Sequence, residues 1–397
     1  MKTRRLCAAL WAAIAVTALP ADALDWSQPW VFVHDSQAAA DAGDEYAWRA
    51  FVAVNWPADV RTRGADPRRD LSANTTAVWE TWQNVKDVFL LGGGDPGPWQ
   101  QRVAVAESFA GARFDVGSFL PSVPARRVVN GVMVTFDPIA DARHLNETRL
   151  NRAAFEYIRG NELYNLDGQL ALFRRGIAPS FPPDSVEVKA QWRPIKEEQR
   201  PRYHTVTVSL ADGSRRLYGL TALHIASKDA ANWFWATFEH VDNEAGVASE
   251  SWVRQSADRF ACRQVAPDCN RAPPAIGLEG TVWQNYRLRG TMVRPLDEAG
   301  RVNLLANSHL EAGVQRTASC ITCHARASIG VIDGQAARLS VLNLRAAPLP
   351  GDSSRGYVGE PDPAWFFPAD SRTRTERLYL PLDFVWSLAK AQPRSSP

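Results

Sequence analysis

VEVKAQW at residues 186–192 opens a series of four strand-like runs, and the others are YHTVTVSL at 203–210, LYGLTALHIAS at 217–227 and WFWATFEHV at 233–241. Val, Thr, Trp and Phe, which favour strands, are frequent in these runs. Asp212 and Gly213 suit a hairpin turn between the second run and the third. The pattern therefore predicts an antiparallel sheet. Along the last run, alternation places four residues on one face: Phe234, Ala236, Phe238 and His240.

Helical patterns flank this sheet along the sequence. Upstream, the spacing of apolar residues predicts helices over 44–56, 76–91 and 138–175. Downstream, the pattern predicts another strand over 281–293 and helices over 296–330 and 384–390. We therefore predict an α+β fold. A Trp-rich helical and antiparallel-sheet region at 24–295 is expected to precede a mainly helical C-terminal region at 296–397.

The first 23 residues have the features of a secretory signal peptide. Basic residues precede an apolar run over 6–19, and the A-x-A sequence at 21–23 fits a cleavage site. We expect a periplasmic protein. No later segment approaches 18 consecutive apolar residues, so stable membrane insertion is not expected. Without residues 1–23 the chain is nearly neutral and has no basic cluster, which disfavours nucleic acid as a partner.

The pentapeptide CITCH at 320–324 has the C-x-x-C-H pattern of a c-type haem attachment sequence. On a helix, Cys320 and Cys323 share a face, so both thiols can reach one edge of a porphyrin and add to its vinyl groups. His324 can then bind the iron. The motif therefore predicts one covalently attached haem c, held by Cys320, Cys323 and His324, with His324 as the metal ligand.

The second axial ligand of the iron is not fixed by the sequence. No Met or His follows His324, so this ligand must come from upstream, from an unusual donor or from water. A second histidine would suit electron transfer at a low potential, whereas an open position would let small molecules reach the iron. The upstream candidates are His240, His224, His309 and Met292.

Two further cysteines, Cys262 and Cys269, lie in a polar stretch. In an oxidising compartment we expect them to form a disulfide that closes a short loop, and buried free thiols are the alternative. The C-x-x-C-H motif also has an alternative interpretation as half of a zinc site. The sequence contains no second C-x-x-C or H-x3-H to complete such a site.

Three stretches carry a family resemblance: Ser319–Ala325 around the motif, NWFWATFEH at 232–240 and DFVWSL at 383–388. Together with the export signal, they resemble a group of largely uncharacterised bacterial c-type cytochrome family proteins. The resemblance implies covalent haem and the capacity for electron transfer, and it implies no substrate. The chain differs from small class I cytochromes because its motif lies near the C-terminus with no downstream Met, so the distal ligand of that class is not carried over.

The leading hypothesis is a periplasmic monohaem c-type cytochrome that transfers single electrons to or from a redox partner protein. No H-E-x-x-H, P-loop or G-x-S-x-G motif suggests another chemistry. The alternative is a haem enzyme with an open distal site, with peroxidase-like or small-gas reductase activity. A third possibility is a non-haem binding protein, in which some of the 15 Trp residues stack on a sugar and the motif holds structural zinc.

Overall fold

The structure is a computed structural model. It describes residues 24–100, 144–210, 213–243, 259–260, 271–311, 315, 318–339, 360–368 and 376–395, and the backbone of short strands at 115–116, 125–129 and 132–136. The expected signal peptide at 1–23 and the expected disulfide between Cys262 and Cys269 lie outside the described residues.

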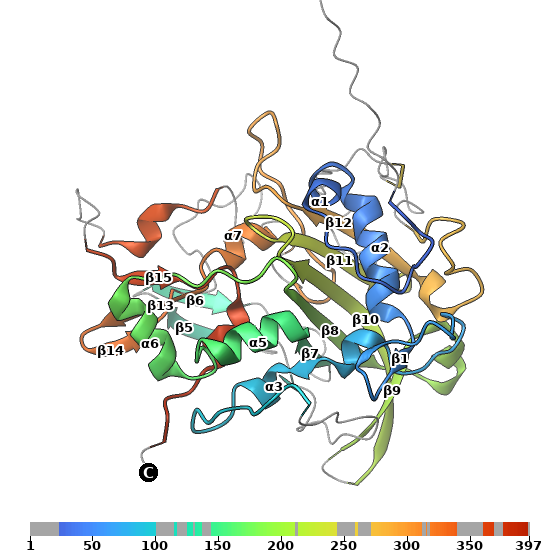
Figure 1. Cartoon of the computed structure of the whole chain (residues 1–397), viewed down its shortest axis with the longest axis horizontal. Coiled ribbons are helices and arrows are strands. Elements are labelled where there is room, and N and C mark those ends of the chain that lie inside the picture. The colour runs from blue at the N-terminus through green and yellow to red at the C-terminus, as the bar shows by residue number, and fades with distance from the viewer. Residues whose placement is uncertain are drawn as a thin grey trace, which may run out of the picture.

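The centre of the fold is one large antiparallel sheet (Figure 1). Its strands follow the order β12-β11-β10-β8-β7-β3, while β4 also pairs with β7 and β9 also pairs with β10. The prediction of an antiparallel sheet over 186–241 is confirmed. The strands are β3 (Gln83–Asn84), β4 (Asp115–Val116), β7 (Leu145–Leu150), β8 (Val186–Pro194), β9 (Thr205–Ser209), β10 (Arg215–Ser227), β11 (Phe234–His240) and β12 (Tyr286–Met292).

One face of this sheet is apolar and packs against helix α2 (Gly43–Asn55), close to the helix predicted at 44–56. The ring of Phe238 lies 4.3 Å from that of Phe51 and 5.0 Å from that of Trp48, measured between centroids. All three side chains are buried. Apolar residues alternate along β11, and Trp48 and Phe51 are three positions apart on one face of α2. These two patterns explain why the strand and the helix pack together.

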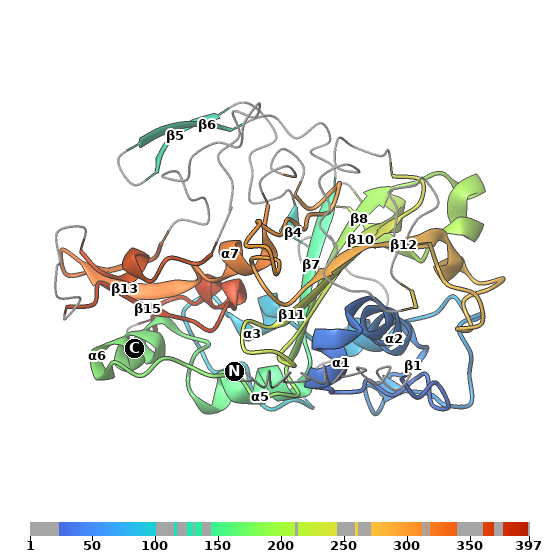
Figure 2. The ribbon, with the colours of Figure 1, turned by 90° about the horizontal axis from the view of Figure 1, so that it is seen from above.

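The opposite face of the sheet is polar. The register pairs Lys189 with His224 and His224 with Thr237, so these three residues lie side by side across β8, β10 and β11. Figure 2 shows α1 (Ser36–Asp41), α2 and α5 (Arg152–Gly160) on one side of the sheet and α7 (Cys320–His324) on the other. The C-x-x-C-H motif on α7 therefore lies on the polar side of the sheet, where His324 contacts Trp235 of β11.

The remaining elements upstream are short. The helices are η1 (Val78–Thr81), α3 (Val85–Val88), α6 (Leu166–Arg175), η2 (Glu197–Arg202) and η4 (Val282–Asn285). The strands are β1 (Ala58–Asp59), β2 (Gly64–Ala65), β5 (Ala125–Val129) and β6 (Val132–Phe136). Asparagine side chains cap the N-termini of α5 and α6, and Gly176 at φ 67° ends α6.

The C-terminal region corrects the predicted fold class. The prediction of a mainly helical region at 296–397 was wrong. The described residues there form a three-stranded sheet in the order β14-β13-β15 and only short helices. The run Ser328–Ile332 contains three β-branched residues, which favour a strand. The helix predicted over 296–330 did not take this preference into account. The elements of this region are α7, β13 (Ser328–Ile332), β14 (Gln335–Ala337), η6 (Pro363–Phe366), β15 (Tyr379–Pro381) and η7 (Trp386–Lys390).

Two upstream helical predictions also need correction. The segment 76–91 holds only the short elements η1, β3 and α3. The segment 138–175 contains helices α5 and α6, but Leu145–Leu150 is the strand β7, paired with β8. Pairing in the central sheet outweighs the local helical pattern at both places. The fold is therefore sheet-rich with antiparallel sheets.

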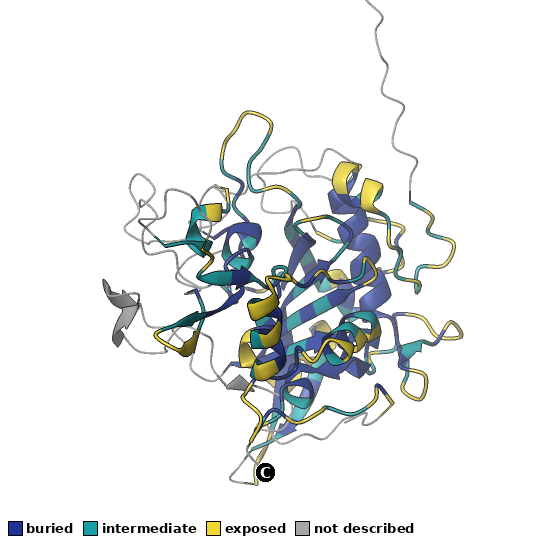
Figure 3. Ribbon diagram, turned by 60° about the vertical axis from the view of Figure 1, so that its left-hand side comes forward, coloured by how far each residue is buried: buried dark blue, intermediate teal, exposed yellow. Residues whose placement is uncertain are grey.

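One hydrophobic core cluster includes residues from both predicted regions. Phe238 and Leu288 belong to the central sheet, whereas Ile329, Leu380 and Leu388 come from the C-terminal region. Figure 3 shows buried residues continuing from the central sheet towards α7 and its neighbours. The boundary between 295 and 296 stays a prediction. In the part of the chain that the structure describes, no helix combines the length and the apolar character needed to span a bilayer.

Candidate functional site

Helix α7 carries the three residues of the motif. The Ser319 side chain accepts a hydrogen bond from the backbone N–H of Thr322 and so caps the N-terminus of the helix. Cys320 and Cys323 are not joined by a disulfide, are half-buried, and lie one helical turn apart. Both cysteines lie on a helix as expected, but that helix covers only Cys320–His324 and is not part of a longer one over 296–330.

The His324 imidazole has a defined orientation. Its Nδ1 lies 2.7 Å from the backbone oxygen of Phe384. Because a carbonyl only accepts, Nδ1 carries the proton, and Nε2 keeps the lone pair that a metal would need. The Trp235 ring packs against the imidazole, with centroids 4.2 Å apart and planes inclined by 50°. Burial lowers the pKa of His324 to about 3, so the ring is neutral near pH 7.

The carbonyl that orients His324 belongs to an unusual turn. Asp383 and Phe384 both adopt positive φ, at 47° and 68°, which is uncommon for residues other than glycine. Asp383 is held on both carboxylate oxygens, because Lys228 Nζ lies 2.6 Å from Oδ1 and the backbone N–H of Phe181 donates to Oδ2 at 2.7 Å. The contacts from Lys228, which directly follows β10, and from Phe181 fix the turn that faces His324.

A second contact ties the same segment to α7. The indole Nε1 of Trp386 donates to the backbone oxygen of Cys323 at 3.0 Å. The next residue, Ser387, donates to the buried carboxylate of Glu187 on β8 at 2.6 Å. The C-terminal segment thus bridges the haem motif and the polar face of the sheet.

Charged and ionisable groups lie next to this site. His224 Nε2 and Glu311 Oε1 are 2.9 Å apart, and both residues are half-buried. After burial and the bond to Phe384, the main electrostatic influences on the pKa of His324 come from Lys189, His224 and Glu311. Among the candidate distal ligands, His224 is therefore the one that acts electrostatically on His324.

The thiol chemistry can be compared with that of a zinc site. Burial raises the pKa of Cys320 well above its usual value, and the charge of Glu311 adds to the effect. This favours the neutral thiol, whereas zinc binds thiolates. Within the described ranges, no group of three or more His, Cys, Asp or Glu residues is arranged to hold a metal ion.

The other distal-ligand candidates are placed differently. His240 belongs to the apolar face of β11, where it stacks on Tyr203 at 3.6 Å and uses both ring nitrogens in hydrogen bonds to backbone groups. His309 Nδ1 is buried, with no hydrogen-bond partner among the described residues. The Met292 sulfur accepts from Ser319 Oγ at 3.5 Å, next to the start of α7. His240 thus has the least suitable position of the four.

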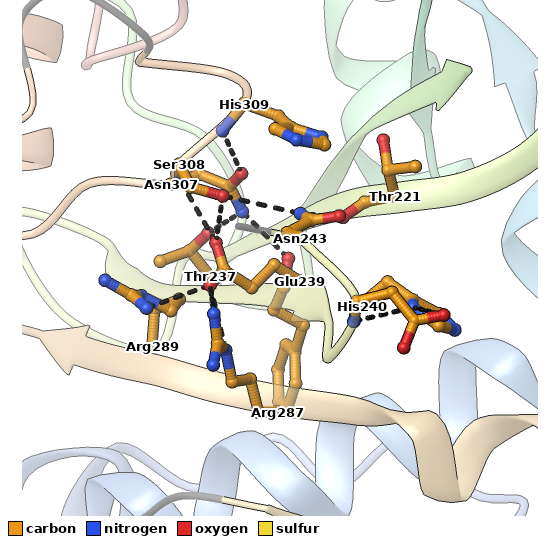
Figure 4. A network of polar contacts seen from close by, with 12 residues as sticks. Thr221, Thr237, Glu239, His240, Asn243, Arg287, Arg289, Asn307, Ser308 and His309 are labelled. Atoms are coloured by element: carbon orange, nitrogen blue, oxygen red, sulfur yellow. Dashed lines mark hydrogen bonds and ion pairs between the residues drawn. The ribbon is translucent and has the colours of Figure 1, made fainter. Parts of the chain in front are cut away.

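A buried ion cluster beside the motif was missed by sequence reasoning (Figure 4). Glu239 is fully buried and accepts hydrogen bonds from Arg287 at 2.6 Å, from Arg289 at 2.9 Å and from the Ser308 hydroxyl at 2.6 Å. Asn307 donates to Thr237 Oγ1 at 3.0 Å. The alternation of Arg287 and Arg289 on a strand was the available signal, since it places both on one face. The cluster anchors the segment that leads to α7.

Comparisons with protein family models, with curated proteins and with solved structures found no match for this chain.

Proposed function

We propose that this protein is an exported monohaem c-type cytochrome that transfers single electrons, with the haem attached to Cys320 and Cys323 and its iron bound by His324. The observation that carries the proposal is the 2.7 Å bond between His324 Nδ1 and the Phe384 oxygen, on the helix that holds both cysteines of the motif. A histidine that donates Nδ1–H to a carbonyl is the usual arrangement of a metal-binding imidazole, because the bond fixes the tautomer and orients the ring.

The residues around α7 suit this role chemically. Each thioether forms when the sulfur of a reduced cysteine bonds to a haem vinyl group and a proton adds to the other vinyl carbon, so two cysteines that are not joined by a disulfide are required. The haem would supply a one-electron couple. The Phe384 carbonyl would increase the basicity of the imidazole, and Trp235 would shield it from water.

The proposal leaves one ligand open. His224, His309 and Met292 are placed on the side of the sheet that faces α7, and water is the fourth choice. A protein ligand would support electron transfer alone. An open position would support the alternative function, a haem enzyme acting on a peroxide or a small gas.

A potentiometric titration of the haem-loaded protein tests the proposal. We expect one reversible couple with a one-electron slope of about 59 mV per decade. The absorption spectrum of the reduced protein should not change when carbon monoxide is added. A carbon monoxide adduct together with peroxide turnover would favour the enzyme instead, and a colourless protein with no couple would contradict both.

A further inference from the structure

A pocket of about 350 Å³ is lined in part by residues of α2. Figure 2 shows α2 on the opposite side of the large sheet from α7. The pocket is formed by the segment before α1, the last turn of α2, the β1–β2 hairpin and the start of α5. The volume suits a small organic molecule. The residues that give the pocket its chemistry are Trp30, Arg63, Trp82, Trp99, Asn151 and Arg152.

The walls of the pocket are aromatic and held in place by other aromatic rings. Trp30 packs on Trp56 with centroids 5.6 Å apart, and Trp99 packs on Phe155 at 5.7 Å. Trp82 is buried and also lines the pocket. Fixed indole rings favour a flat, apolar ligand, because the rings provide contact area without losing conformational freedom on binding.

Arg63 brings a positive charge next to these aromatic rings, and its backbone adopts an uncommon conformation. It lies just before β2 in the β1–β2 hairpin, with φ at 61°, a conformation that a long side chain rarely adopts. Only 6% of the residue is exposed. Its guanidinium lies 4.6 Å from the centroid of Trp99 and donates to Gln83 Oε1 at 3.2 Å. A backbone outlier of this kind is a reason to look for a function of the side chain.

The electrostatics of the pocket favour an anion. Burial lowers the pKa of Arg63, the nearby charge of Arg149 lowers it further, and Asp87 acts in the opposite direction. A negatively charged ligand would therefore interact favourably with this buried guanidinium. The rim adds Arg152, which is exposed and lies 3.7 Å from Glu156. Among the described residues that line the pocket, those that carry a charge are Arg63 and Arg152.

We propose that this pocket binds a small aromatic carboxylate, whose ring lies among Trp30, Trp82 and Trp99 and whose carboxylate faces Arg63. Arg152 provides a further cationic group in the lining. This site is lined in part by α2, which lies on the opposite side of the sheet from α7, and it does not depend on the proposed haem function.

Isothermal titration calorimetry with a matched pair of probes tests the proposal. Naphthalene-2-carboxylate and naphthalene-2-carboxamide have the same ring system and differ in charge. We expect the full-length protein to bind the carboxylate at least tenfold more tightly than the amide, and to lose part of that preference at high salt. Equal affinity for the two probes, or no binding of the carboxylate at millimolar concentration, would overturn the proposal.

The variant Arg63→Gly separates binding from structure. Glycine adopts positive φ without strain, so the hairpin should keep its conformation while the cation is lost. We expect binding of the carboxylate to weaken at least tenfold more than binding of the amide. Arg63→Asn, which also tolerates positive φ, serves as a second variant if the first folds poorly. Unchanged affinity of the folded variants for the carboxylate would refute the assignment.

Arg61→Ala is the matched control. Arg61 lies in the same hairpin, and its side chain is 85% exposed beside Asp59. It does not line the pocket, so its loss should leave both affinities unchanged. A drop in affinity equal to that of Arg63→Gly would show that general surface charge, and not this pocket, attracts the probe.

Discussion

At the scale of single residues, the contact between Lys228 and Asp383 controls the turn that orients His324. The two charged groups are 2.6 Å apart, and their side chains are 12% and 9% exposed. Burial raises the pKa of Asp383, so the carboxylate depends on its hydrogen bonds to Lys228 and Phe181. The Phe384 carbonyl follows directly in the chain, and any movement of Asp383 would move it too.

The first prediction concerns Lys228→Met. This variant keeps the length of the side chain but leaves Asp383 buried without its cation, which should cost about 3 kcal/mol in the free energy of unfolding. Urea denaturation at pH 7.5 measures the effect. Lys196→Met, at an exposed lysine, is the control and should change stability by less than about 0.5 kcal/mol. Equal stability of the two variants would show that the contact does not hold the turn.

The second prediction is a pH dependence carried by His240. Burial lowers the pKa of this fully buried side chain to about 4. Between pH 6.5 and pH 4 the unfolded chain binds a proton that the folded protein excludes, so the free energy of unfolding falls as the pH decreases. At pH 5 the loss from this residue is about 2 kcal/mol.

His240→Gln should remove this contribution. Urea denaturation at pH 7.5 and pH 5.0 gives the loss of stability on acidification for the wild type and for the variant. We expect the loss to be smaller in the variant by about 2 kcal/mol. The same loss in both proteins would mean that His240 is protonated in the folded state.

The residues of the proposed site divide into those that the sequence reveals and those that it cannot reveal. Cys320, Cys323 and His324 lie within five residues, and in the proposed haem site the porphyrin would set their spacing, so a local pattern suffices. Phe384 acts through its backbone oxygen and lies 60 residues away. Because any residue type at position 384 has a backbone oxygen, no sequence pattern indicates that this residue accepts the hydrogen bond from His324.

At the scale of elements, Glu239 joins β11, β12 and the segment at 303–311. Its carboxylate holds Arg287, Arg289 and Ser308 together inside the protein. Loss of the charge would leave two arginines buried without their counter-ion. The third prediction is that Glu239→Gln lowers the free energy of unfolding by about 3 kcal/mol.

Urea denaturation measures this effect, and Arg301→Ala provides its control. Arg301 pairs with Asp297 on the surface, where its side chain is 78% exposed, so its removal should cost less than about 1 kcal/mol. A cost for Glu239→Gln as small as that of Arg301→Ala would argue that the cluster does not anchor the segment.

Helices and strands that depend on local sequence patterns were predicted more accurately than segments that depend on contacts between distant residues. Helix α2 and the strands from β8 to β11 have strong local patterns that agree with their packing, and they were predicted correctly. The segment at 303–311 was predicted to be helical, but Asn307 and Ser308 bond to β11. Such contacts join residues about 70 positions apart. The apolar periodicity of a short sequence window carries no information about them.

At the scale of the whole molecule, the C-terminal region completes the core of the sheet. Ile329, Leu380 and Leu388 belong to the same hydrophobic cluster as Phe238. The fourth prediction is that residues 24–295 alone do not unfold cooperatively, because Trp235 and Glu239 lose their buried partners. Urea denaturation beside the 24–397 chain tests this, and a sharp transition in the shorter chain would show that 24–295 is an independent domain.

The most direct test of the central claim is the intact mass and the pyridine haemochrome spectrum of protein made in a host that matures c-type cytochromes. The account predicts the mass of the exported chain plus one haem, and a c-type spectrum. The variant Cys320→Ala/Cys323→Ala should lack covalent haem. Wild-type protein that is colourless and has the mass of the apoprotein would contradict the account.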